Sequence, residues 1–220
     1  MKKATVLLFL VVTARIRGQS PLQRPECTGI IHGIVYALSG QPAPGVKLSA
    51  VPLGVDMAVF LPTVKSDQSG EYRFEHLCRG QYAVVPDDPT AGYPVASPYL
   101  NEFLYGTRMI AVRLNWLHRR AELPVHLPPK PGSMLLHVRD SKTNTEIRKL
   151  KARLRVPGQR RFPEISFECD DNGRDCRYLV PPDKNVILLV NVEGYKEITR
   201  SISVVAGTQT ILDLNVERLN

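Results

Sequence analysis

The side chains in this sequence that could do chemistry are scattered along the chain rather than grouped. The five histidines, His32, His76, His118, His126 and His137, stand singly, and no second ligand lies at a spacing that suits a metal ion. Neither the G-x-S-x-G nor the H-E-x-x-H pattern occurs, which argues against the common hydrolase and zinc-protease signatures. We therefore expect no enzymatic activity, no catalytic residue, no bound metal and no cofactor.

One acidic segment is similar to the first half of a calcium-binding loop. Glu168, Asp170 and Asn172 alternate before Gly173, but the position that should carry a bidentate glutamate is Leu179. Because half of the ligand set is missing, we favour a plain Asp-Asn-Gly turn closed by a disulfide over a calcium site.

The four cysteines favour disulfides, because no C-x-x-C or Cys/His zinc spacing is present. Three pairings are possible. Cys169 and Cys176 bracket the short segment DDNGRD, whose ends come together in any turn, so we predict a Cys169–Cys176 bond and therefore a Cys27–Cys78 bond. In a loop-entropy model these bonds contribute about 2.5 and about 4 kcal/mol, respectively.

The N-terminus has the pattern of an export signal. Lys2 and Lys3 precede the apolar run ATVLLFLVVTA, which is shorter than the ~20 residues that span a bilayer. We predict a signal peptide over residues 1–18, cleaved after Ala14 or Gly18, with a buried N-terminal strand as the alternative. The mature protein would then be secreted, periplasmic or attached to the cell envelope, with no transmembrane segment.

The positive charge of the chain does not indicate nucleic-acid binding. The formal net charge is +8, and without the predicted signal 25 basic and 21 acidic residues remain, a net charge of +4. The basic run KLKARLR at 149–155 alternates cations with leucine and alanine, which is the period of a half-buried strand. No aromatic residues are interleaved with the cations, so we expect no nucleic-acid partner.

Short apolar runs separated by turn residues indicate an all-β protein. Runs such as GIIHGIVYAL, EYRFE and QYAVVP alternate with SGQPAPG, DQSG and HLCRG, and no window of twelve residues shows a helical period. The pattern starts again after the proline-rich segment LPPKPG, which predicts two β-sandwiches, at 27–129 and 133–220. A cut between Pro128 and Ser133 is expected to give two fragments that each unfold cooperatively.

The first half resembles a known family of domains. GIIHGIVYALSGQPAPGVKLSAVP and VKSDQSGEYRFEHLCRGQYAV resemble the carboxypeptidase regulatory-like domain, a transthyretin-like (prealbumin-like) β-sandwich. The positions that carry the resemblance, which covers residues 29–129, are Gly33, Val35, Gly40, Pro42, Gly45, Val46, Asp67, Gly70, Tyr72, Phe74, Leu77, Gly80 and Tyr82. The second half matches more loosely, through LHVRDSKTN, DDNG, LVPPDKN and EGY. The resemblance implies two tandem transthyretin-like or Ig-like sandwiches, the second more divergent.

The motif residues have a structural explanation of their own. Asp67 and Gly70 suit a tight turn, because Asp bonds the backbone two residues on and Gly accepts a positive φ. Tyr72 and Phe74 share one face of a strand, and the Tyr82 hydroxyl can reach a backbone partner. We therefore predict a non-catalytic binding or spacer module at the cell envelope; the alternative is an accessory domain pair of an extracellular hydrolase or peptidase, or an unrecognised enzyme of this kind.

Two segments are candidates for ligand contact. NWLHRR places the only tryptophan, Trp116, beside His118, Arg119 and Arg120, although we favour packing of Trp116 against the end of the sandwich. The segment 87–106 is read as a long loop rich in aromatic residues. It adds Tyr99, Phe103 and Tyr105 as candidate contacts, with packing as the alternative. The predicted partner is an extracellular or envelope protein or a glycan.

Overall fold

A computed structural model describes residues 27–54, 61–170 and 176–219 of the chain. The signal peptide predicted for residues 1–18 lies outside these ranges, and so does most of the Asp-Asn-Gly turn that was weighed as a calcium loop. Within the described ranges, no helix has the length and apolar character needed to cross a membrane.

The N-terminal half consists of two four-stranded sheets. The first contains β4 (Glu71–Leu77), β1 (Gly29–Tyr36), β7 (Arg120–Glu122) and β8 (Val125–His126). The second contains, in spatial order, β3 (Thr63–Lys65), β2 (Lys47–Pro52), β5 (Gly80–Pro86) and β6 (Ala111–Leu114). In the first sheet β4 pairs with β1 antiparallel, whereas β7 and β8 pair with it parallel, one after the other. Side chains of both sheets form one buried cluster.

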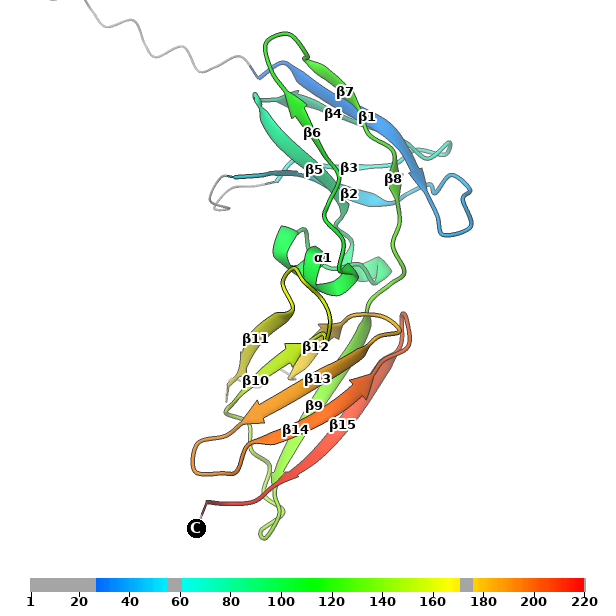
Figure 1. Ribbon diagram of the computed structural model, residues 1–220. Coiled ribbons are helices and arrows are strands. Elements are labelled where there is room, and N and C mark those ends of the chain that lie inside the picture. Colours follow the sequence, from blue (N-terminus) through cyan, green and yellow to red (C-terminus); the bar gives the residue numbers. More distant parts are fainter. Residues whose placement is uncertain (1–26, 55–60, 171–175, 220) are drawn as a thin grey trace, which may run out of the picture.

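The C-terminal half repeats this two-layer plan with different connections. One sheet has the order β11 (Glu164–Cys169), β10 (Leu150–Arg155), β13 (Asn185–Asn191) and β14 (Ile198–Ser203). The other has the order β12 (Arg177–Val180), β9 (Gly132–Asp140) and β15 (Gln209–Val216). The two β-rich halves follow one another end to end in Figure 1. The predicted all-β fold class is confirmed.

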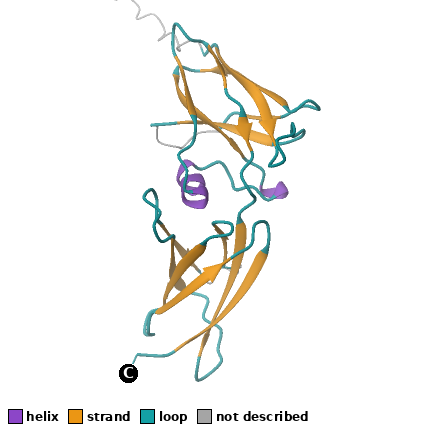
Figure 2. Cartoon of the chain, turned by 45° about the vertical axis from the view of Figure 1, so that its right-hand side comes forward, coloured by secondary structure: helices purple, strands orange, loops and turns teal. Residues whose placement is uncertain are grey.

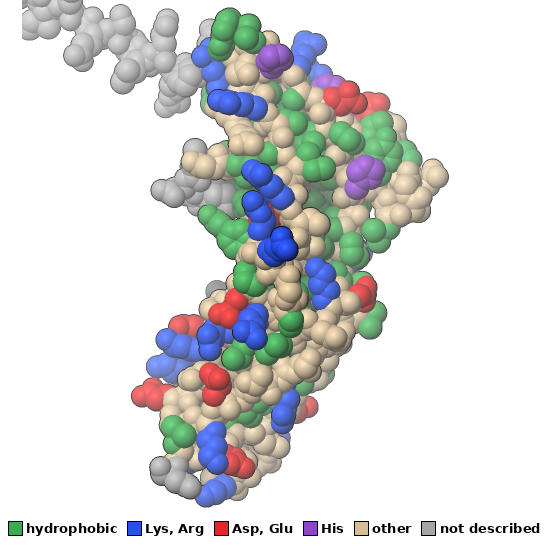
Figure 3. All heavy atoms as spheres, viewed as in Figure 1, with side chains coloured by type: hydrophobic (Ala, Val, Ile, Leu, Met, Phe, Trp, Pro, Cys, Tyr) green, Lys and Arg blue, Asp and Glu red, His purple; other side chains and the backbone are tan. Residues whose placement is uncertain are grey.

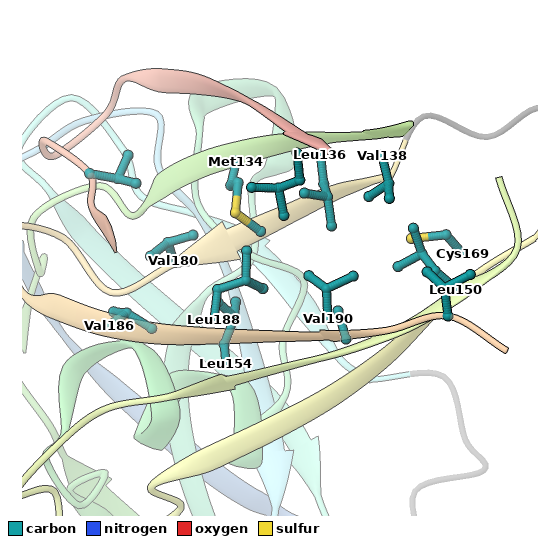
Figure 4. Close-up of a cluster of buried hydrophobic side chains, with 14 of the residues drawn as sticks. Met134, Leu136, Val138, Leu150, Leu154, Cys169, Val180, Val186, Leu188 and Val190 are labelled. Carbon is teal, nitrogen blue, oxygen red and sulfur yellow. The ribbon is translucent and has the colours of Figure 1, made fainter. Parts of the chain in front are cut away.

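The alternating pattern of the sequence decides which face of each strand is buried. In β10, Leu150 and Leu154 are buried, whereas Lys151 and Arg153 are exposed, as the KLKARLR run predicted. The core of the C-terminal half lies between its sheets, where Met134 of β9 faces Leu188 of β13 (Figure 4).

The Asp67–Gly70 turn and the strand after it have the predicted structure. Asp67 accepts the backbone N–H of Ser69 and of Glu71, both at 2.9 Å. Gly70 has a φ of +79°, and a Cβ atom there would lie 2.9 Å from Cβ of Pro42, so only glycine fits without a shift. Tyr72 then enters the core with 3% of its surface exposed.

Both predicted disulfides are confirmed. Cys27 is bonded to Cys78 and ties the start of β1 to the turn before β5. Cys169 is bonded to Cys176 between β11 and β12. The Tyr82 hydroxyl donates to the carbonyl of Cys78 at 3.0 Å, so the predicted backbone partner of Tyr82 lies in the same disulfide-linked turn.

The segment 87–106, read from the sequence as a loop, contains two helices. They are a 3-10 helix, η1 (Pro89–Ala91), and an α-helix, α1 (Pro98–Tyr105). Ser97 caps α1 by accepting the N–H of Leu100 at 3.3 Å, Pro98 occupies the first turn, and Gly106 ends the helix with a φ of +70°. At eight residues, α1 is too short to be found in a search for helical periods over twelve residues.

Candidate functional site

Helix α1 lies between the two halves of the molecule (Figures 1 and 2). The chain reaches it from β5 and leaves it for β6, so in sequence it belongs to the N-terminal half. The buried apolar side chains of α1, however, pack in the core of the C-terminal half. Phe103 and Leu104, 1% and 0% exposed, belong to the buried cluster of the C-terminal half. The C-terminal core is therefore completed by side chains from the other half of the protein.

The C-terminal end of α1 is also held by the C-terminal half. Gln159 Nε2 donates to the carbonyls of Glu102 at 3.3 Å and Phe103 at 3.2 Å. Lys184 Nζ donates to the carbonyl of Tyr105 at 3.3 Å. The last carbonyls of a helix have no partner within the helix, so these bonds satisfy groups that would otherwise be open.

Most of the aromatic residues predicted as ligand contacts in this segment are packing residues. Phe103 is buried in the C-terminal core and is not available to a ligand, so its predicted role as a surface contact is wrong. Tyr105 is half-buried, burial raises the pKa of its hydroxyl, and among the described residues that hydroxyl has no hydrogen-bond partner. Tyr99 is 64% exposed and meets Phe162 edge to face, with ring centroids 5.1 Å apart.

The second predicted contact segment forms a tight turn between β6 and β7. The N–H of Asn115 donates to the carbonyl of His118 at 3.0 Å. The side-chain oxygen of Asn115 accepts the N–H groups of Leu117 and His118, at 2.9 and 2.7 Å. Trp116 and Leu117 occupy the two central positions, and each is 64% exposed. The favoured expectation that Trp116 packs against the sandwich is therefore wrong.

Exposed arginines precede and follow this turn in the chain. Arg119 and Arg120 follow it directly, Arg113 precedes it on β6, and all three are exposed. Exposed Arg79, from the turn between β4 and β5, lines the same small pocket as Asn115 and Arg119. In Figure 3, hydrophobic side chains at the upper end of the molecule lie beside basic ones. Of the four predicted residues, Trp116 and His118 thus lie in an exposed turn, and Arg119 and Arg120 are exposed where the chain leaves it.

In the described part of the chain, no group of three or more His, Cys, Asp or Glu side chains is placed to hold a metal ion. Asp140 has a strongly lowered pKa, because the backbone N–H groups of Thr143 and Lys142 and the side chains of Arg218 and Tyr195 all donate to its carboxylate. These contacts close a structural link between the end of β9 and the last described residues.

The sequence did not lead us to the residues that hold α1 and the Asn115–His118 turn in place. The helix signal was present locally, because Ser97 followed by proline, with Gly106 eight residues after Pro98, is the usual pattern of helix ends. The role of Asn115 could also have been inferred, since Asn at the first position of a turn bonds the backbone beyond it. Nothing local identifies Gln159, whose partners on α1 lie more than fifty residues away.

Comparison with known proteins gives distant matches only. No family model matches the sequence, and no curated protein matches it. Among solved structures, the chain is similar to the Bacillus anthracis TIE protein, at 13% identity and a TM-score of 0.32, over 88% of this chain and 34% of that one. It is also similar to a streptococcal ancillary pilin (17%, TM-score 0.32, 88% and 63% covered) and to the minor pilin of Streptococcus agalactiae (12%, TM-score 0.33, 88% and 97% covered).

The chain thus spans about a third of the length of the first of these proteins and less than two thirds of the second. These identities and TM-scores are too low to assign the chain to a family. The resemblance to the carboxypeptidase regulatory-like domain, and the two tandem copies of it, remain predictions from the sequence.

Proposed function

We propose that the protein is a non-catalytic extracellular spacer that holds the Asn115–His118 turn as a contact surface at one end of a stiff body. The observation that carries this proposal is the position of Phe103, which leaves the N-terminal half and is buried in the C-terminal core. Two domains joined only by a linker are expected to move relative to one another, unless their interface is large and hydrophobic. Because Phe103 and Leu104 of α1 are part of the C-terminal core, the two halves have little freedom to move relative to one another.

The linker between the halves supports the same proposal. Residues 128–131 are Pro-Pro-Lys-Pro, a composition that favours an extended and semi-rigid backbone. The carbonyl of Lys130 accepts the N–H of Gly207 at 3.1 Å, which ties the linker to the C-terminal half. Linker and helix together provide two connections between the halves.

The two disulfides support an extracellular location, since such bonds persist mainly in oxidising compartments. The turn supports a contact function, because an exposed tryptophan with arginines around it is typical of binding surfaces.

Stiffness can be measured with spin labels on the two halves. Labels on the exposed positions Gln41→Cys and Asn215→Cys should give a narrow distance distribution by double electron–electron resonance. Phe103→Ala should broaden it, because the helix loses its anchor in the core. Val95→Ala is the control, an exposed apolar residue of the same segment (58% exposed), and should leave the distribution narrow. A broad distribution without any core substitution would contradict the proposal.

A further inference from the structure

We propose that the Asn115–His118 turn docks on a membrane surface that carries anionic phospholipids, with Trp116 and Leu117 entering the headgroup region. This inference rests on the proposed function only in taking the turn as the contact surface. It replaces the protein or glycan partner expected from the sequence with a different class of partner.

The backbone of the turn holds two apolar side chains out into solvent. Trp116 and Leu117 are adjacent and equally exposed, and the side-chain oxygen of Asn115 accepts the backbone N–H groups of Leu117 and His118. Their orientation is thus built into the turn. The ring of tryptophan has an apolar body and a polar N–H, which is why it is enriched where hydrocarbon meets water.

The turn lies at one end of the molecule. The connection between β6 and β7 lies at the upper end of the molecule in Figure 1, far from the C-terminus. A turn at the end of a stiff body can meet a flat surface without interference from the C-terminal half. Leu38, which is 71% exposed, lies beyond the other end of β1 and could not touch the same surface.

The segment that contains the turn is positively charged. From Gly106 to Ala121 the chain contains four arginines and no acidic residue. The carboxylate nearest in sequence to Arg79 is Glu75, which pairs with Arg73 at 2.6 Å, and Glu122 follows Arg120 by two residues on β7. Exposed arginines that flank two exposed apolar side chains are complementary to an anionic bilayer, which attracts basic residues within a Debye length of its surface.

The shape of the turn argues against the expected glycan. A sugar site needs a platform with side-chain carboxylates or amides that bond the hydroxyl groups. Here the amide oxygen of Asn115 is used within the turn, the neighbouring side chains are cationic, and the pocket at the base is small. A convex apolar tip instead suits a fluid surface that closes around it.

The test uses intrinsic fluorescence, because Trp116 is the only tryptophan in the chain. Phosphatidylcholine vesicles that contain phosphatidylglycerol should shift its emission to shorter wavelength, and brominated lipids should quench it. Vesicles of phosphatidylcholine alone should do neither, and high salt should reverse the shift.

Paired variants separate the apolar and the charged contributions. Arg119→Gln with Arg120→Gln should weaken partition onto phosphatidylglycerol vesicles by about 30-fold. Trp116→Ala with Leu117→Ala should weaken co-sedimentation by at least about tenfold. The control for charge is Lys149→Gln with Arg155→Gln, two exposed cations of the C-terminal half, and the control for apolar surface is Leu38→Ala. Both controls should bind like the unaltered protein.

Either of two results would overturn the proposal. One is the absence of any emission shift and co-sedimentation with phosphatidylglycerol vesicles at low salt. The other is binding that survives the loss of both Trp116 and Leu117. The outcome is separate from that of the spacer proposal, because the spin-label distances are measured without vesicles. Broad distances together with turn-dependent vesicle binding would remove the stiff spacer and leave the docking surface.

Discussion

The two halves of the molecule share a two-layer plan but differ in how their cores are completed. Among the described residues, every member of the buried cluster of the N-terminal half comes from that half. The cluster includes the aromatic side chains Tyr72, Phe74, Tyr82 and Tyr93. The buried residues of the C-terminal cluster are almost all aliphatic, and the aromatic ring buried in it, Phe103, comes from the N-terminal half. In the part of the chain that the structure describes, the C-terminal core therefore takes buried side chains from the N-terminal half, whereas the N-terminal core takes none from the C-terminal half.

This difference changes what a domain boundary means in the chain. A boundary at the proline-rich linker would place α1 in one half and the core that its side chains fill in the other. Removing a buried phenylalanine costs about 3–5 kcal/mol, and removing a buried leucine costs about 2–5 kcal/mol. Small domains are stable by only about 5–15 kcal/mol, so a C-terminal half without the helix has little margin.

The largest expected effect is that of cutting the chain at the linker. The fragment 27–131 should unfold cooperatively, because its core is its own. The fragment 133–220 lacks Phe103 and Leu104 and should show a broad, low-temperature transition by circular dichroism and poorly dispersed amide signals. Adding a peptide of residues 96–107 should partly restore a cooperative transition of the C-terminal fragment. A C-terminal fragment that melts as it does within the whole chain would show that the helix is dispensable.

The disulfides give the next largest contrast. Cys27 and Cys78 are 51 residues apart, and Cys169 and Cys176 are 7 apart. In the loop-entropy model, replacing the first pair by alanine lowers the free energy of unfolding of the N-terminal half by about 4 kcal/mol, and replacing the second pair lowers that of the C-terminal half by about 2.5 kcal/mol. Calorimetry of the two double variants should show each half responding to its own bond.

Coupling between the halves predicts an asymmetry in this experiment. When the N-terminal half unfolds, α1 loses its connection to folded structure on that side, and its side chains fill the C-terminal core less well. The loss of the Cys27–Cys78 bond should therefore also lower the melting temperature of the C-terminal half slightly. The loss of the Cys169–Cys176 bond should leave the N-terminal transition in place. The reverse asymmetry would mean that the dependence between the cores has been assigned in the wrong direction.

The parts of the fold that the sequence predicted are those with local causes. Alternation in β10 predicted its buried face, Asp67 and Gly70 predicted their turn, and the short spacing of Cys169 and Cys176 predicted both bonds. Each of these depends on residues that are near in the chain or on simple elimination.

The parts that the sequence did not predict depend on contacts between residues far apart in the chain, or depart from the usual burial of large aromatic side chains. The burial of Phe103 follows from where α1 meets the C-terminal core, and no local pattern encodes that meeting. Trp116 was expected to be buried because large aromatics usually are, whereas the bonds of Asn115 hold it outward. The contact of Asp140 with Arg218 spans 78 residues and is invisible to any pattern search.

The smallest of the predicted effects on stability concerns the contact between Asp140 and Arg218, which joins the end of β9 to the last described residues. The side chain of Asp140 is 2% exposed, and its carboxylate lies 2.9 Å from Arg218 Nε and 2.9 Å from the Tyr195 hydroxyl. Backbone N–H donors from Thr143 and Lys142 add to these contacts and hold the pKa of Asp140 well below its ordinary value.

Asp140→Asn should lower the melting temperature of the C-terminal half at neutral pH, while Asp213→Asn, an exposed carboxylate on the adjacent strand β15, should change it little. The pKa of Asp140 is lower in the folded than in the unfolded protein, where it is about 4. Its stabilisation is therefore complete above that value and is lost as the pH falls toward the folded-state pKa. The difference in melting temperature between the unaltered protein and Asp140→Asn should stay constant from neutral pH down to about pH 5 and shrink below about pH 4. A difference that does not change with pH would mean that Asp140 acts through the shape of its turn and not through its charge.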